Sequence, residues 1–159
     1  MIDPRRRLGA RHQLFTDGLA PTLLVHGADV AAAAPPGVET LALPAAASGD
    51  GLDLAALAAA LRARGCRRAF VEGGARTVSA FLRAGLLARL QVAVAPLLIG
   101  AGRPSVRLPG WIALADCLRA RHRVFRMGPD VLFDLDLDLA SRRGGGEPAL
   151  EPPGLQRVL

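Results

Sequence analysis

The residues with the clearest chemical potential are Glu72-Gly73-Gly74, which separate a short apolar segment from a stretch of helix-forming residues. A strand over residues 68–72 followed by a helix over residues 77–87 would give a strand–turn–helix unit around the two glycines. Glycine lets a ligand approach the backbone, and the first turn of a helix offers unpaired amides and a partial positive charge to an anion. The pattern predicts a phosphate cradle, and the alternative is a tight turn that binds nothing.

The donors of this predicted cradle are the backbone amides of Gly74, Ala75, Arg76 and Thr77, with the Thr77 hydroxyl as a further donor. The Arg76 side chain either pairs with a phosphate or is one more arginine of an arginine-rich chain. Glu72 is expected at the carboxyl end of a buried strand, where an unpaired carboxylate is costly. It is therefore expected to accept hydrogen bonds from ligand hydroxyls, or else to cap the turn or pair with a neighbouring arginine.

The remaining sequence supplies the elements that would position this turn. Short strands are predicted over residues 23–26 and 38–43, and an amphipathic helix runs from the N-cap Asp53 to Gly65. A near-continuous apolar run over residues 90–98 predicts a central strand. Gly128-Pro129-Asp130 separates two further strands and predicts a β-hairpin. Strands alternating with helices indicate an α/β fold with three layers and a mixed, mostly parallel sheet that ends in this antiparallel hairpin.

Composition narrows the class of protein further. The net charge is +6, but all 20 basic residues are arginine, and aromatic residues make up only 4% of the chain. This favours a compositional bias over a nucleic-acid interface. No apolar run reaches the length of a membrane span, and no signal peptide is evident, so a cytoplasmic protein without a membrane partner is expected. Residues 1–140 are expected to form one domain, and residues 141–159, rich in glycine and proline, a disordered tail.

Three aspartates alternate with leucines near the end of that domain, and three histidines are widely separated. Asp134, Asp136 and Asp138 share one face of a strand, and their spacing favours a solvated outer face over a cation site. The histidines lack the spacing of metal ligands, so no metal site is predicted.

Several motifs, taken together, resemble a known family. The run FVEGGARTVSAFLRAGLLARLQVAVAPLLIGAGRPSV, followed by LPGWIALAD and VFRMGPDVLFDL, resembles the C-terminal reductase domain of the bifunctional riboflavin-biosynthesis deaminase–reductase. That domain belongs to the dihydrofolate reductase-like superfamily. The resemblance extends over residues 2–137 and implies NADPH-dependent reduction of 5-amino-6-(phosphoribosylamino)uracil to its ribitylamino form, by a homodimer acting on this small phosphoribosyl-pyrimidine.

The resemblance also assigns roles to individual residues. It implies that Glu72 contacts the substrate and that the NADPH pyrophosphate lies along Gly73, Gly74, Ala75, Arg76, Thr77, Val78, Ser79 and Ala80. It identifies no catalytic acid or base.

The sequence departs from the family pattern at its start. Family domains carry a strand, a helix and a Thr-x-x-x-Asp-Asp-Pro loop ahead of the segment that resembles Ile2-Asp3-Pro4, and Pro4 replaces a serine that contacts NADP. The domain is therefore expected to lack its first strands. This leaves a second hypothesis, a truncated and non-catalytic family member that binds a nucleotide or a partner chain.

Overall fold

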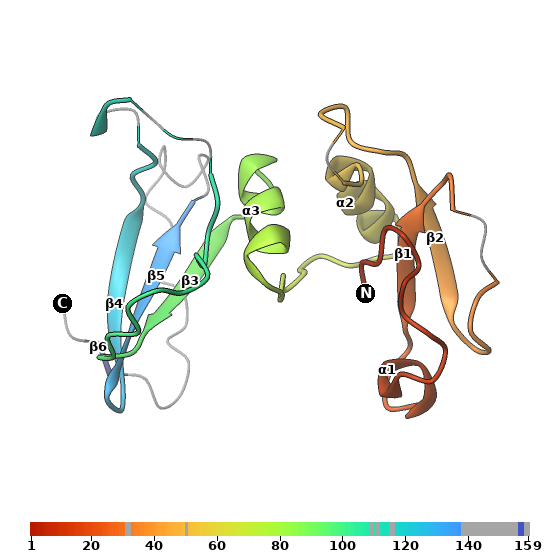
Figure 1. Cartoon of the computed structure of the whole chain (residues 1–159), viewed down its shortest axis with the longest axis horizontal. Helices are drawn as coiled ribbons and strands as arrows, with labels where there is room; N and C mark the ends of the chain where they lie inside the picture. The colour runs from red at the N-terminus through yellow and green to blue at the C-terminus, as the bar shows by residue number, and fades with distance from the viewer. Residues whose placement is uncertain are drawn as a thin grey trace. The chain divides into compact units, whose positions relative to one another are not determined.

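The computed structural model describes residues 1–30, 33–49, 51–108, 110, 112–114, 117–137 and 156–157. These residues form two compact units, Met1–Ala69 and Phe70–Leu159, each with its own sheet (Figure 1). The single domain expected over residues 1–140 stays a prediction. No helix within the described ranges is long and apolar enough to cross a membrane.

The first unit is built on parallel strands. β1 (Leu23–Gly27) pairs with β2 (Glu39–Leu43), and Leu23 lies opposite Glu39. The first residues of the chain run parallel to the other edge of β1, because Val25 donates its amide to the Met1 carbonyl and Asp3 donates to Val25 (2.8 and 2.9 Å). β1 therefore has neighbours on both edges, and its centre is buried as the apolar run predicted.

Two helices complete this unit, and both are short. α1 spans Gln13–Thr16, and α2 spans Leu54–Ala63. The Asp53 side chain accepts a hydrogen bond from the Ala56 amide (2.9 Å), which confirms the predicted N-cap. At the other end Gly65 has φ 83°, and the amides of Gly65 and Cys66 return to Arg62 and Leu61. This is a Schellman motif, and it confirms the predicted glycine stop.

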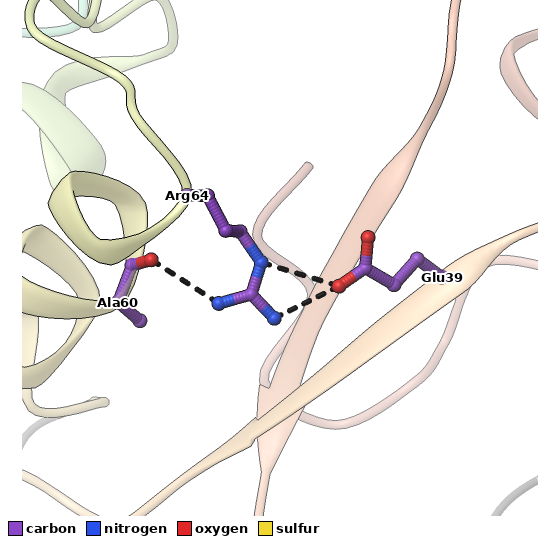
Figure 2. Close-up of polar contacts among 3 residues, drawn as sticks. All are labelled: Glu39, Ala60 and Arg64. Carbon is purple, nitrogen blue, oxygen red and sulfur yellow. Dashed lines mark hydrogen bonds and ion pairs between the residues drawn. The ribbon is translucent and has the colours of Figure 1, made fainter.

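An arginine fastens the end of α2 to the neighbouring strand. Arg64 donates from Nε and Nη2 to Oε1 of Glu39 at 3.2 and 2.8 Å, and from Nη1 to the Ala60 carbonyl at 3.1 Å (Figure 2). The apolar core of this unit includes Leu24, Leu43 and Leu57, which are buried. Burial of these leucines supplies most of the stabilisation, because the Arg64–Glu39 pair is largely exposed to water.

The second unit is antiparallel. Its strands are β3 (Arg89–Val94), β4 (Arg121–Met127), β5 (Asp130–Asp136) and β6 (Gln156–Arg157), in the order β3-β5-β4-β6. β4 and β5 form the predicted hairpin, and Gly128 at φ 60° followed by Pro129 fits a type II′ turn. The run expected to be a central strand contributes an edge strand, since β3 pairs with β5 and with no other strand among the described residues.

The structure corrects two other expectations. The α/β class is confirmed, but the parallel and antiparallel pairings lie in two separate sheets, and the three-layer arrangement stays a prediction. The expected strand over residues 68–72 does not form, because these residues have no hydrogen-bonded partner strand within the described ranges. The disordered tail stays a prediction, since it lies outside the described residues except for Gln156–Arg157, which pair with β4.

Candidate functional site

The turn that leads into α3 (Ala75–Arg83) carries the residues singled out by the sequence. Residues 70–73 form an irregular segment in which Phe70 is 79% exposed and Glu72 is exposed. Glu72 therefore does not bear the cost of burial that its expected strand-end position implied. Its carboxylate has no hydrogen bond or ion pair within the described part of the chain, so it is free to accept one.

Gly73 and Gly74 differ in backbone conformation and in the space available for a side chain. Gly73 has φ 154°, and a Cβ added there would lie 3.0 Å from the Thr77 Cβ. Gly74 has an ordinary φ of −75°, and a Cβ added there would meet nothing within 4 Å. The fold therefore requires glycine at position 73, whereas the structure leaves open space beside Gly74.

The amino end of α3 keeps unpaired donors. Gly74 is the N-cap, and no side chain caps the helix. The Thr77 and Val78 amides both donate to the Gly74 carbonyl, at 3.0 and 3.3 Å, so Thr77 does not offer the free amide that the sequence predicted. The amides of Gly74, Ala75 and Arg76 have no acceptor within the described residues. Unpaired amides at the amino end of a helix, together with the helix dipole, are the groups that favour an anion.

The other residues of the predicted cradle differ in accessibility. Arg76 is exposed and forms no ion pair within the described ranges, whereas Val78 and Ala80 are half-buried. Ser79 is fully buried, and its hydroxyl accepts the Arg107 amide at 2.7 Å. Arg83 donates to the carbonyl of the same Arg107 at 3.2 Å. The Ser79 hydroxyl therefore holds α3 against the segment that precedes β4 through this hydrogen bond.

A second polar loop lies at the start of the other unit, over residues 3–8. Its hydrogen bonds were not predicted from the sequence. Asp3 is 5% exposed, and its Oδ2 accepts the Leu8 amide at 2.8 Å. The Pro4 carbonyl accepts the Gly27 amide at 3.0 Å, and a Cβ at Gly27 would come within 3.2 Å of that carbonyl and 2.5 Å of Asp29 Oδ1. This loop therefore lies against the carboxyl end of β1, the end at which open α/β sheets bind ligands.

The structure corrects the prediction that the aspartates of β5 lie on a solvated face. Asp134 is only 4% exposed, and its Oδ2 accepts hydrogen bonds from Arg89 Nη2 and Arg123 Nη2 at 2.5 and 2.6 Å. The expected solvated face is therefore wrong at Asp134, because two cations from the flanking strands compensate its burial. Asp136 is half-buried, and Asp138 lies outside the described residues.

The polar groups described above are suited to holding anions. Within the described ranges, no group of three or more histidine, cysteine, aspartate or glutamate side chains could hold a metal ion. His26 is 9% exposed, and its Nδ1 lies 2.9 Å from the Gly27 carbonyl. The turn before α3 therefore combines an accessible carboxylate, Glu72, with backbone amides that have no acceptor within the described residues.

Comparison with known proteins identifies the family of the chain. Residues 1–133 match the family model described as the RibD C-terminal domain. Comparison with the curated proteins found no matching sequence.

Solved structures give the same fold at low sequence identity. Acinetobacter baumannii RibD, form 1, is similar with a TM-score of 0.68, 21% identity and coverage of 85% of this chain and 36% of that one. The Saccharomyces cerevisiae riboflavin biosynthesis reductase Rib7 is similar with a TM-score of 0.66, 18% identity and coverage of 85% of this chain and 66% of that one. The chain therefore spans about a third of the length of the RibD structure and about two thirds of the Rib7 chain.

Proposed function

The chain belongs to the RibD C-terminal domain family, and from this premise we propose that it is an NADPH-dependent reductase of riboflavin biosynthesis. Its substrate is 5-amino-6-(phosphoribosylamino)uracil, and its product is the ribitylamino form. The reaction consumes one NADPH and one proton, and the ribose is opened and reduced at its anomeric carbon. NADPH supplies the hydride when it is bound, and the protein supplies position and electrostatics.

The observation that carries the proposal is the amino end of α3. The amides of Gly74, Ala75 and Arg76 have no acceptor within the described residues, and a Cβ added at Gly74 would meet nothing within 4 Å. A pyrophosphate fits such an end because its charge complements the helix dipole and its oxygens accept from backbone donors. We place the cofactor pyrophosphate here, with the Thr77 hydroxyl and the Arg76 guanidinium as further donors.

The remaining residues of the family segment take secondary roles in this proposal. Gly73 sets the direction of the turn, and Val78, Ser79 and Ala80 form the helical turn behind the donors. Because Ser79 already accepts the Arg107 amide, it supports the cradle by fixing α3 and does not contact a phosphate. Glu72, exposed and unpaired within the described residues, is proposed to accept hydrogen bonds from substrate hydroxyls.

Binding of NADPH by the chain can be tested through the Gly74 position. The fluorescence of the reduced nicotinamide is followed during titration of the wild-type chain and of Gly74→Val. We expect saturable binding by the wild type and at least about tenfold weaker binding by the variant, because the added side chain occupies the phosphate position. Gly110→Val is the matched control, since a Cβ there also meets no atom within 4 Å. Equal affinity in Gly74→Val would refute the placement of the pyrophosphate.

Turnover separates the reductase from the alternative hypothesis, a non-catalytic nucleotide-binding or partner-binding module. NADPH oxidation is measured by absorbance in the presence and absence of the phosphoribosylamino-pyrimidine. The proposal expects substrate-dependent oxidation that Glu72→Gln weakens mainly through a higher KM. Unfolding should be unchanged, because the Glu72 carboxylate makes no hydrogen bond or ion pair within the described residues. Saturable NADPH binding without turnover would favour the binding module.

Assembly and location are part of the same proposal. We infer a homodimer in the cytoplasm. Large apolar side chains are exposed on the segment after β3, where Leu97, Leu98 and Ile99 are 69%, 101% and 75% exposed, and β3 is a sheet edge. Exposed apolar side chains and an open edge favour association with another chain. A single monomeric species in analytical ultracentrifugation would contradict the dimer.

A further inference from the structure

Residues 67–73, the segment between α2 and the turn of α3, have no regular secondary structure. Their backbone amides and carbonyls take part in no hydrogen bond within the described part of the chain. All of these residues are exposed except Val71, which is half-buried, and the aromatic side chain of Phe70 is 79% exposed. The backbone of this segment is therefore accessible in the folded protein.

Two consecutive arginines, Arg67 and Arg68, begin the segment. Both are exposed, and neither forms a hydrogen bond or an ion pair with any residue that the structure describes. The specificity pocket of trypsin-like endopeptidases carries a carboxylate at its base, which pairs with a basic side chain of the substrate. An exposed arginine without a partner can enter such a pocket without first losing an interaction in its own protein.

An endopeptidase also binds the backbone on both sides of the bond that it cleaves. Recognition of an extended peptide uses main-chain hydrogen bonds, so amides and carbonyls near the bond must be free. Residues 67–73 meet this requirement because the strand expected over residues 68–72 does not form. The free stretch is bounded by helices, since Gly65 terminates α2 and α3 starts at Ala75.

The other arginines of the described residues lack this combination of a free side chain and a free backbone. Those of the helices and strands lie in regular hydrogen-bonded structure. In the loops, the amide that follows the arginine already donates a hydrogen bond after Arg5, Arg7, Arg11 and Arg64. The side chains of Arg6 and Arg119 donate to carbonyls. The carbonyl of Arg107 accepts a hydrogen bond, and Arg103 precedes Pro104, which has no amide hydrogen.

We infer that the peptide bond after Arg67 or Arg68 is a modification site, open to limited proteolysis by arginine-specific endopeptidases in the folded protein. Hydrolysis adds water across this bond and leaves a carboxylate on the arginine and an ammonium group on the next residue. The pairing of β1 with β2 lies before the site, and the pairings among β3, β4, β5 and β6 lie after it. Both sheets therefore keep their strand pairings in the cleaved chain, while the Glu72–Gly74 turn stays joined to α3 alone.

Limited digestion of the full chain with trypsin under native conditions, followed by mass spectrometry of the products over time, tests this site. We expect the first cut within the described ranges after Arg67 or Arg68. It should be at least about a hundredfold faster than cuts after Arg62 or Arg76, because bonds in helices open only by local unfolding. The double variant Arg67→Gln/Arg68→Gln should lose this cut, whereas Arg62→Gln, which removes an exposed arginine of α2, should keep it. A faster first cut at any other described arginine would overturn the assignment.

A second variant distinguishes cleavage of the folded chain from cleavage after unfolding. Asp53→Ala removes the N-cap of α2 and destabilises that helix. A bond that is reached only after unfolding of this unit would then be cut about fivefold faster. The proposal expects equal rates in Asp53→Ala and the wild type, and an acceleration of this size would overturn it. Neither NADPH nor substrate is needed, so the outcome is independent of the test at Gly74.

Discussion

Replacement of Asp134 by asparagine is expected to destabilise the second unit, because it removes the charge that compensates Arg89 and Arg123. Oδ2 of Asp134 accepts both hydrogen bonds, and the buried Oδ1 has no partner to lose. A hydrogen bond to a charged group contributes about 1.5–3 kcal/mol, and breaking a fully buried ion pair costs about 3–5 kcal/mol.

The exposure of Arg89 and Arg123 to solvent decides which of these two free-energy ranges applies to Asp134→Asn. The side chains of Arg89 and Arg123 are 45% and 23% exposed, so both guanidinium groups can regain water after the substitution. Asparagine also retains one acceptor of the same shape. We therefore expect the free energy of unfolding to fall by about 1.5–2 kcal/mol, the lower part of the range for charged hydrogen bonds.

Urea unfolding of the full chain, followed by far-UV circular dichroism, measures this difference. Asp130→Asn is the control, because Asp130 starts the same strand and makes no side-chain hydrogen bond within the described residues; its effect should stay within about 0.5 kcal/mol. A double-mutant cycle with Arg89→Gln should show a coupling of about 1 kcal/mol. If Asp134→Asn unfolds within about 0.5 kcal/mol of the wild type, the carboxylate does not compensate the two cations and the reasoning is wrong.

Substitutions at three further residues test the local interactions. Ser79→Ala should lower the free energy of unfolding by about 1–3 kcal/mol, because it leaves the Arg107 amide without its acceptor, and an unchanged urea midpoint would contradict this. Asp53→Ala should cost about 1 kcal/mol through loss of the N-cap of α2, whereas Asp53→Asn should restore most of it; equal loss in both variants would argue against capping. Glu39→Gln should change the free energy of unfolding by less than about 0.5 kcal/mol, because its pair with Arg64 is largely exposed, and a loss above 1 kcal/mol would show that this pair is stronger than surface pairs usually are.

Elements with local determinants were predictable from the sequence. The Asp53 cap, the Gly65 stop and the Gly128-Pro129 turn each depend on contacts within a few residues, and the structure confirms all three. Helix α3 was predicted with less accurate ends, since it starts at Ala75 and ends at Arg83 instead of spanning residues 77–87. The unpaired amides before α3 were also predictable from the sequence, because the first turn of a helix leaves its amides without intrahelical acceptors wherever the helix lies.

What only the tertiary structure decided concerns pairing between distant segments. A strand exists only where another strand accepts its hydrogen bonds, and for this reason residues 68–72 could not be settled from their apolar pattern. Alternation along β5 shows which side chains share a face but not whether that face is covered, and of the two cations that pair with Asp134, Arg89 is 45 residues away. The contacts of Arg6 have the same origin. In the sequence Arg6 is one arginine among twenty, and only the folded loop determines that its Nη2 donates to the Ala33 carbonyl while its Nη1 is buried without a partner among the described residues.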